Sequence, residues 1–313
     1  MNSRPELTGA CRLDDWGVIR ARGADAATFL QGQLTNDVLG LDDAAARLAG
    51  FCSAKGRLQA SFVVWRTQAE EFLLACSADL LAPTLKRMSM FVLRARCQLV
   101  DASAEVTLRG LAGATASEHL RDVAVWHRRD AGEAQVIRLP DGAGHPRAIL
   151  AAPSSGDATS TAAPRLDVDV WRWLAVQSGI VTIEAATVDR FVPQMVNFER
   201  IGGVDFKKGC YPGQEVVARS QYRGTAKRRT FLFDCEAIPA AGQDVFATGA
   251  PQEAMGTVAN AAPRPGESGG SALVELRLAA LHQGELRLGA VDGPRLDRRE
   301  LPYPLPAEPE LAA

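Results

Sequence analysis

Alternating apolar and polar positions predict a series of short strands in the first part of the chain. Residues 16–22 (WGVIRAR) alternate in this way, and the Gly-Ala-Asp that follows supplies a turn, with Asp25 as the N-cap of a short helix. Lys55-Gly56 divides residues 51–65 into two β-rich runs, which predicts a hairpin. In the second run, one face carries the side chains of Leu58, Ala60, Phe62 and Val64.

A strand at residues 72–76 and a helix over residues 78–91 are predicted to follow the hairpin. Because Pro83 lacks a backbone N–H and suits the first turn of a helix, we expect this helix to start near Ala82. Strands and helices then recur at short intervals to about residue 150.

The second half of the chain changes character twice. Residues 151–164 lose hydrophobic periodicity and are rich in Ser, Thr, Pro and Ala, which predicts a mobile connection. Residues 166–178 return to a helical pattern that Gly179 can end, and after residue 226 short strands alternate with Pro and Gly turns. We therefore predict an α+β fold with two domains, a domain of mixed sheets and helices at 1–226 and a small β-barrel at 227–306.

Composition and charge narrow the class of protein. The 313 residues are 47% apolar and 23% charged, and the net charge of −2 with a pI of about 6.1 argues against a protein that coats nucleic acid. The start of the chain lacks the apolar core of a signal peptide, and no run reaches the roughly 18 apolar residues of a membrane span. We expect a cytoplasmic protein without membrane contact.

The six cysteines are spread along the chain without a C-x-x-C pair, which matches neither a disulfide framework nor a metal or cluster ligand set. They are Cys11, Cys52, Cys76, Cys97, Cys210 and Cys235. We expect reduced thiols and no metal site.

The densest candidate for chemistry is residues 206–215, FKKGCYPGQE. Residues 200–229 contain eight basic and two acidic side chains, so this region carries a local charge of +6. Lys207 and Lys208 precede Cys210, and Pro212 can open a helix, so positive charge and unpaired N–H groups both favour the thiolate. The alternative is a buried apolar cysteine beside a solvated charged face.

This segment resembles the signature of the YgfZ family, the folate-binding relatives of the glycine cleavage system T protein, which include a mitochondrial iron–sulfur assembly factor. Its core, K-G-C-Y-x-G-Q-E, comprises Lys208, Gly209, Cys210, Tyr211, Gly213, Gln214 and Glu215. The segments LDDWGVIRARGADAATFLQGQLTNDV and FCSAKGRLQASF, and the tail from MGTV to LPY, resemble other parts of the family. The resemblance implies a T-protein-like domain followed by a barrel, with tetrahydrofolate or a derivative as the ligand.

The resemblance also implies residues that contact the folate. Trp16 and Trp171 match the family's two tryptophans, with Trp173 as the alternative if the register differs. Further polar candidates for the pterin and the ligand's carboxylates are Gln177, Asn36, Gln194, Asn197 and Arg223. On residue type alone, each tryptophan is a core residue and each amide a turn or cap residue.

The hairpin argues against the reaction of the T protein. In aminomethyltransferases the matching strand carries acidic residues, including the carboxylate regarded as central to catalysis. Residues 56–62 here (GRLQASF) contain none, and Ala60 and Ser61 cannot act as an acid or base at neutral pH. We therefore predict folate binding without aminomethyl transfer.

The leading hypothesis is a folate-binding protein that supports the assembly or repair of iron–sulfur enzymes, including those that thiolate tRNA, with Cys210 as the reactive thiol and Lys208 beside it. One thiolate is too few for an autonomous cluster, so we expect iron–sulfur proteins or assembly factors as partners, and no direct RNA contact. Two alternatives are a folate-dependent one-carbon transferase of the aminomethyltransferase type, and a redox adaptor whose Cys210 forms mixed disulfides.

Overall fold

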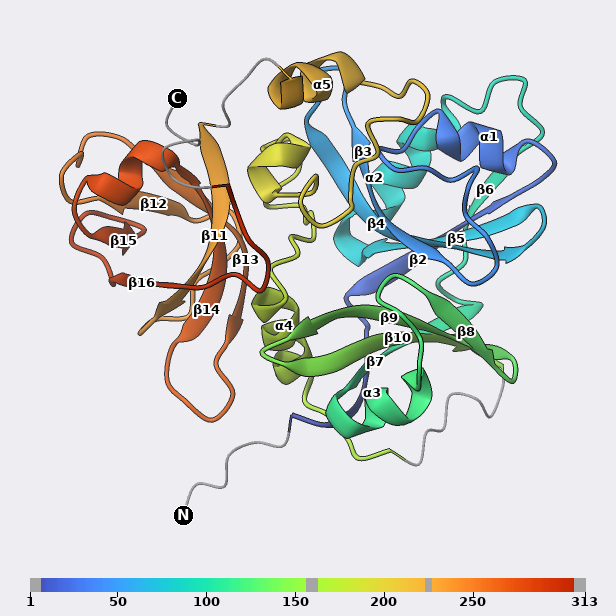
Figure 1. The fold of residues 1–313 in the computed structure, drawn as a ribbon, viewed down its shortest axis with the longest axis horizontal. Helices are drawn as coiled ribbons and strands as arrows, with labels where there is room; N and C mark the ends of the chain where they lie inside the picture. The colour runs from blue at the N-terminus through green and yellow to red at the C-terminus, as the bar shows by residue number, and fades with distance from the viewer. Residues whose placement is uncertain (1–6, 156–162, 223–226, 307–313) are drawn as a thin grey trace.

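In the computed structural model, which describes residues 7–155, 163–222 and 227–306, the chain folds into three antiparallel sheets with short helices packed on and between them (Figure 1). The first two sheets share the N-terminal half of the chain, and the third is C-terminal. This arrangement confirms the predicted α+β fold class.

The first sheet contains the predicted hairpin. Its strand order is β3-β4-β5-β2-β6, built from β2 (Trp16–Arg22), β3 (Ala46–Cys52), β4 (Leu58–Gln68), β5 (Glu71–Ser77) and β6 (Gln98–Asp101). Strands β3 and β4 pair on either side of the Lys55-Gly56 turn. One face of β4, with Ala60, Phe62 and Val64, packs into the core under helices α1 (Ala26–Gln31) and α2 (Ala78–Ser89).

Both helices differ in detail from the prediction. Helix α1 starts after Asp25, but the Asp25 carboxylate accepts a hydrogen bond from the backbone N–H of Arg96 (2.8 Å) and forms an ion pair with its guanidinium (3.3 Å) instead of capping the helix. Helix α2 begins at Ala78, before the expected start at Ala82, with Pro83 inside it. A proline at this position removes one backbone hydrogen bond, and the helix continues through it.

The second sheet has the order β1-β7-β10-β9-β8, from β1 (Gly9–Arg12), β7 (Val106–Ala112), β8 (Arg128–Ala131), β9 (Ala134–Gly142) and β10 (His145–Pro153). Helix α3 (Gly113–Leu120) packs on it. Because β10 continues through Pro153, the predicted connection at 151–164 begins with strand residues, and part of that connection, 156–162, lies outside the described residues.

The C-terminal sheet forms the predicted barrel. Its order is β15-β12-β13-β14-β11-β16, from β11 (Arg228–Cys235), β12 (Asp244–Ala247), β13 (Gly256–Pro263), β14 (Gly270–Arg277), β15 (Leu286–Leu288) and β16 (Leu296–Arg299). A bridge between Arg287 and Arg295 brings its two edges together, and the 3₁₀ helix η3 (Leu278–His282) follows β14. Phe231, Phe233 and Val274 fill its interior.

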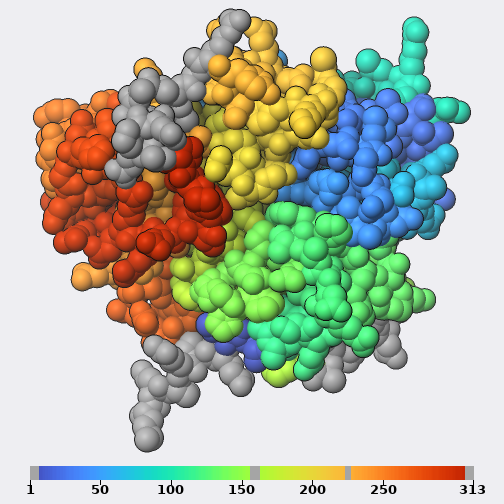
Figure 2. Space-filling model, in the orientation of Figure 1, coloured from blue at the N-terminus to red at the C-terminus, as the bar shows by residue number. Residues whose placement is uncertain are grey.

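The segment between the second sheet and the barrel joins all three sheets. It contains helix α4 (Val168–Gln177), the 3₁₀ helix η2 (Pro193–Val196) and helix α5 (Gln214–Tyr222). The Asp167 side chain caps α4 by accepting from the N–H of Asp169 (2.9 Å), and α4 packs against both β9 and β13. Figure 2 shows this segment, in yellow and gold, between the barrel and the first sheet. Across the described residues, no helix is long and apolar enough to span a membrane.

Candidate functional site

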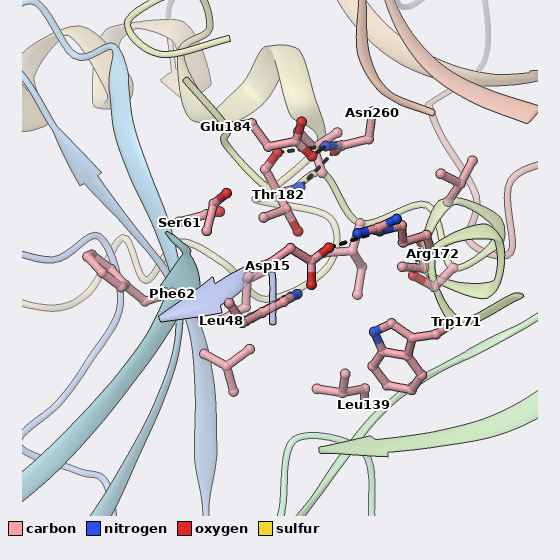
Figure 3. A pocket seen from close by; sticks show the side chains of 18 of the residues that line it. Asp15, Leu48, Ser61, Phe62, Leu139, Trp171, Arg172, Thr182, Glu184 and Asn260 are labelled. Atoms are coloured by element: carbon pink, nitrogen blue, oxygen red, sulfur yellow. Dashed lines mark hydrogen bonds and ion pairs between the residues drawn. The ribbon is translucent and has the colours of Figure 1, made fainter. Parts of the chain in front are cut away.

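A cavity of about 550 Å³ lies where the first two sheets, α4 and the barrel meet (Figure 3). Ser61 and Val63 of β4, Leu139 of β9, Trp171 of α4 and Asn260 of β13 contribute to its walls. These β4 residues point away from the face that packs under α1 and α2, so one strand serves both the core and the cavity. The volume is within the range of roughly 300–1,000 Å³ found for ligand pockets.

Both tryptophans predicted from the sequence line this cavity. Trp16 opens β2 and is half-buried, whereas Trp171 is 2% exposed and lies so close to Gly110 of β7 that a Cβ there would be 2.5 Å from the indole. Trp173, the alternative, is not among the lining residues, and its Nε1 donates to Ser271 Oγ of the barrel (3.1 Å). The register that selects Trp171 is therefore the one that reaches the cavity.

A third tryptophan, Trp126, lines the cavity and was missed in the sequence. It adopts a φ of +60° in a turn, a conformation that is unusual for a bulky residue. Two backbone hydrogen bonds hold it, from its N–H to Arg138 (3.0 Å) and from the N–H of Ala46 to its carbonyl (2.9 Å). Its sequence surroundings, VAVWHRR, contain neither a motif nor a clear period, so only the three-dimensional structure could reveal it.

Carboxylates enter the cavity from elements other than the hairpin. Asp15, just before β2, forms an ion pair with Arg172 of α4 (2.9 Å). Glu184, after α4, accepts a hydrogen bond from Asn260 Nδ2 (2.6 Å), and burial raises the pKa of its carboxyl group. Asp79 of α2 is the third acid in the lining. The absence of an acid from the hairpin therefore does not leave the cavity without carboxylates.

The hairpin position itself is occupied by a neutral group. Ser61 lines the cavity, and its Oγ accepts a hydrogen bond from the N–H of Ile183 (2.9 Å). Asp79 is likewise tied to the same loop, since its carboxylate accepts from the N–H of Ala185 (2.9 Å). These contacts fix residues 183–185 against the first sheet and thereby position Glu184.

Two buried polar atoms of the lining residues have no hydrogen-bond partner within the described part of the chain. They are Oδ1 of Asp15, an acceptor, and Nη1 of Arg147, a donor. Buried polar atoms in folded proteins are nearly always paired, so atoms left open in a cavity fit a bound ligand that completes them. With three indoles and the Glu184 carboxylate, they make the cavity suitable for a flat aromatic ligand that presents both donors and acceptors.

The other predicted folate residues lie away from this lining. Asn36 Nδ2 donates to the carbonyls of Leu48 (2.7 Å) and Gly202 (2.6 Å). Gln194 Nε2 donates to the carbonyl of Val217 (2.7 Å), and Asn197 Nδ2 to that of Thr230 (2.8 Å). These three side chains connect backbone segments, so their assignment to the folate stays a prediction without a contact to the cavity.

Gln177 is the last residue of α4 and is half-buried. Its neighbours Val176 and Ser178 line the cavity, but Gln177 itself does not. Arg223 lies outside the described residues.

The Cys210 segment, residues 205–213, forms a second candidate region. Lys208 lies beneath it, 9% exposed, and its Nζ donates to the carbonyls of Gln31 and Leu34 (2.6 Å for Leu34). The ammonium also lies 4.9 Å from the centre of the Tyr211 ring. Burial lowers the pKa of Lys208 to about 8. Lys208 therefore anchors the segment to the end of α1, and its predicted role toward the thiol stays a prediction.

The same segment is docked on the tip of the hairpin. Gly213 has a φ of +78°, and a Cβ there would lie 2.4 Å from the carbonyl of Ser53 and 2.6 Å from the Cα of Gly56. Gly213 is thus required both by its backbone conformation and by the close approach of the two segments. Gln214 and Glu215 then begin α5, while Lys207 and Gly209 are exposed.

Cys210 is exposed, alone among the six cysteines, all of which are described. Burial raises the pKa of the Cys11, Cys52 and Cys76 thiols to about 12 and that of half-buried Cys97 to about 11. Burial also raises the pKa of Cys235. Cys210 does not line the cavity. Within the described ranges, no three His, Cys, Asp or Glu side chains come together as metal ligands.

Comparisons with known proteins agree with this fold. The family model for the GCVT N-terminal domain matches residues 8–136. The tRNA-modifying protein YgfZ of Edwardsiella ictaluri (strain 93-146) is 37% identical over 253 residues, which are 75% of this chain and 74% of that protein. The protein of the same name from Escherichia coli O157:H7 (strain EC4115 / EHEC) is 31% identical over 248 residues, which are 74% of each.

A solved structure extends the likeness to almost the whole chain. The glycine cleavage system aminomethyltransferase T from Bartonella henselae matches with a TM-score of 0.71 and 14% sequence identity, over 96% of this chain and 87% of that chain. Identity at this level shows the fold, including the barrel, and leaves the reaction to be argued from the site.

Proposed function

The chain belongs to the family of the tRNA-modifying protein YgfZ, and from this premise we propose that it binds a reduced folate, tetrahydrofolate or a derivative, in the cavity beside Trp16 and Trp171. The observation that carries the proposal is the combination of aromatic walls with unpaired polar atoms in one cavity of suitable size. A GCVT-type domain in the same part of the chain supports it.

The chemistry of the lining suits a pterin. The ring is flat and can stack on an indole, and its amino and N–H groups need acceptors. Glu184 and the open Oδ1 of Asp15 supply acceptors, and Ser61 adds a hydroxyl. When bound, the folate would supply a one-carbon carrier, while the chain's own residues bind and orient it and exclude water.

We further propose that Cys210 acts as a thiol in the assembly or repair of iron–sulfur proteins, with effects on tRNA modification that follow from its client enzymes. The exposed thiol on an anchored segment supports this role, as does the spread of free, unpaired cysteines, which fits a reducing cytoplasm. Iron–sulfur proteins or their assembly factors would be the partners, because a single exposed thiol supplies too few ligands for a cluster of its own.

Two measurements test the two parts. Titration of the purified protein with 5-formyltetrahydrofolate should quench tryptophan fluorescence, and absence of quenching and of heat in calorimetry would refute folate binding. In a strain that lacks the protein, the wild-type chain should restore the activity of iron–sulfur enzymes and Cys210→Ser should not. Full restoration by Cys210→Ser would refute the role of the thiol while leaving the folate proposal standing.

A folate-dependent one-carbon transferase is the second candidate, because Asp79 and Glu184 place carboxylates in the cavity. Each is already bound, Asp79 to the N–H of Ala185 and Glu184 to Asn260, which favours a binding role over proton transfer. Folate-dependent aminomethyl transfer that is lost in Asp79→Asn would establish this candidate instead.

A further inference from the structure

Arg147 is a buried cation that forms no salt bridge within the described part of the chain. It comes from β10 and is 3% exposed. Nε donates to the carbonyl of Pro140 (3.2 Å) and Nη2 to Ser178 Oγ (3.3 Å), while Nη1 has no hydrogen-bond partner among the described residues. Burial lowers the pKa of this guanidinium to about 9. The charge of Asp141 acts against this lowering, but the hydrogen-bond acceptors of the guanidinium are both neutral. A buried charge without a bonded carboxylate is costly, so its presence calls for an explanation.

The guanidinium is also placed at the cavity wall. Its Cζ lies 4.9 Å from the centre of the Trp171 ring, and both residues line the cavity. The other arginine of the lining, Arg172, is already paired with Asp15 (2.9 Å) and Asp169 (3.0 Å). Of the two, Arg147 is therefore the cation that can receive an anionic group from a ligand.

The two ends of the cavity differ in charge. Figure 3 shows Glu184, Thr182 and Asn260 together at one end, with Trp171 at another. A carboxylate of the ligand would be repelled near Glu184 and attracted at the Trp171 end, where Arg147 lies. The N–H groups of a ligand have the opposite preference.

We propose that Arg147, with Ser178 and the face of Trp171, forms a subsite that donates hydrogen bonds to a carboxylate of the ligand. This contact fixes the orientation of the ligand in the cavity. The proposal rests on the folate-binding function above and assigns the glutamyl carboxylate to Arg147, with the N–H-rich edge of the pterin toward Glu184. The same donor could bind the C4 carbonyl of the pterin, which is an oxygen acceptor at the other end of a folate. The two sources call for different probes.

The test is a comparison of ligands in wild type and Arg147→Met, a change that removes the charge while keeping an apolar side chain of similar length. The ligands are 5-formyltetrahydrofolate, its diamide with both carboxylates neutralised, and a 4-amino analogue that lacks the C4 carbonyl. Wild type should bind the acid about tenfold to hundredfold more tightly than the diamide, because charge-assisted hydrogen bonds are lost. In Arg147→Met this preference should fall below about threefold.

Arg138→Met is the matched control. Arg138 comes from neighbouring strand β9 and does not line the cavity, so its variant should keep the wild-type preference for the acid. Arg147→Lys, which keeps a charge without the planar fork, should keep part of it. The melting temperature of ligand-free Arg147→Met should equal or exceed that of wild type, because an unpaired buried charge has been removed.

Three outcomes of the ligand comparison overturn the proposal. Equal binding of acid and diamide by wild type removes the carboxylate subsite, and so does an unchanged preference in Arg147→Met. If that variant loses discrimination against the 4-amino analogue alone, Arg147 faces the pterin carbonyl instead. Should wild type bind no folate, the proposed function fails by itself, and p-aminobenzoylglutamate then tests the subsite. A melting-temperature increase with this fragment in wild type, absent in Arg147→Met, would support the subsite, and no increase would refute it.

Discussion

The cavity and the Cys210 segment differ in how their buried polar groups are hydrogen-bonded. In the cavity, one buried polar atom each of Arg147 and Asp15 lacks a hydrogen-bond partner in the part of the chain that the structure describes, and a bulky residue, Trp126, adopts a left-handed backbone conformation. In the Cys210 segment, the buried Lys208 ammonium is bound to two carbonyls, and the exposed group is the thiol. The cavity thus has hydrogen-bonding atoms that a ligand can pair, whereas the buried ammonium of the Cys210 segment is already bonded and the segment presents a thiol to solvent.

The two regions share strand β4 and the hairpin that leads into it. The hairpin tip at Gly56 contacts the Cys210 segment at Gly213, while Ser61 and Val63 further along β4 line the cavity. The regions are therefore joined structurally, but Cys210 is not among the cavity residues. Changes in one region should leave the chemistry of the other intact, and this separation can be tested variant by variant.

The largest expected effect concerns thiol alkylation. In wild type at neutral pH, one thiol should react with N-ethylmaleimide much faster than the other five, and Cys210→Ser should abolish the fast reaction completely. Folate affinity should change by less than about twofold, within measurement error for an untouched site. Mass spectrometry of the labelled protein identifies the thiol.

Cys97→Ser is the control for this experiment, because Cys97 is half-buried and burial raises its pKa to about 11. It should leave the fast reaction unchanged. A fast phase that survives in Cys210→Ser would show that another thiol is accessible, and a large loss of folate affinity would contradict the separation of the two regions.

The next effect is on ligand stacking. Trp16→Ala should weaken folate binding about tenfold to hundredfold, the usual cost of losing an aromatic stacking surface. Trp171→Phe should have a smaller effect in the same direction, whereas Trp173→Phe should have none, because Trp173 bonds to Ser271 in the barrel. Calorimetric titration measures all three. Equal losses for Trp171→Phe and Trp173→Phe would move the stacking surface away from the cavity. Cys210 alkylation should be unaffected throughout.

The sequence predicts the helices and strands around the two regions better than it predicts the residues that line the cavity. The hairpin, helix α4 and the barrel follow from local periodicity and turn residues, which depend on short stretches of chain. Trp16 and Trp171 followed from the family resemblance. Trp126 and Arg147 could not be predicted, because their meaning arises from burial beside residues far away in the chain.

The amides show a different limit of the sequence. Asn36, Gln194 and Asn197 have the donors and acceptors that a pterin needs, but an amide equally suits the joining of backbone segments. Residue type cannot separate these uses, since both require a buried amide with fixed geometry. All three donate to main-chain carbonyls, and Asn197 also donates to the Tyr303 hydroxyl. Their assignment to the folate therefore stays a prediction.

A smaller effect is expected at the acidic end of the cavity. Glu184→Gln should weaken folate binding about tenfold, because a charged acceptor is replaced by a neutral amide. Folate affinity of wild type should fall as the pH decreases, because the Glu184 carboxylate becomes protonated. Since burial raises the pKa of Glu184, this loss should begin at a higher pH than for an exposed glutamate. Glu184→Gln should remove this part of the pH dependence, and Glu253→Gln, in an exposed barrel ion pair, should not. Parallel pH profiles in wild type and Glu184→Gln would exclude Glu184 as the acceptor.

The smallest effect is on stability and belongs to Lys208. Burial lowers the pKa of this amine from its ordinary value of 10.5 to about 8, so between these pH values the unfolded chain binds a proton that the folded chain does not. The free energy of unfolding therefore rises with pH across this window. Below the window both states carry the proton, and this rise is absent. Relative to Lys208→Met, wild type should gain about 1–2 kcal/mol between pH 7 and pH 10, with partial screening by solvent. Urea unfolding at each pH measures the difference, and Lys207→Met, at the exposed neighbour, should show no such gain. A constant difference between wild type and Lys208→Met would mean that the ammonium keeps its proton in the folded state, held by the carbonyls of Gln31 and Leu34.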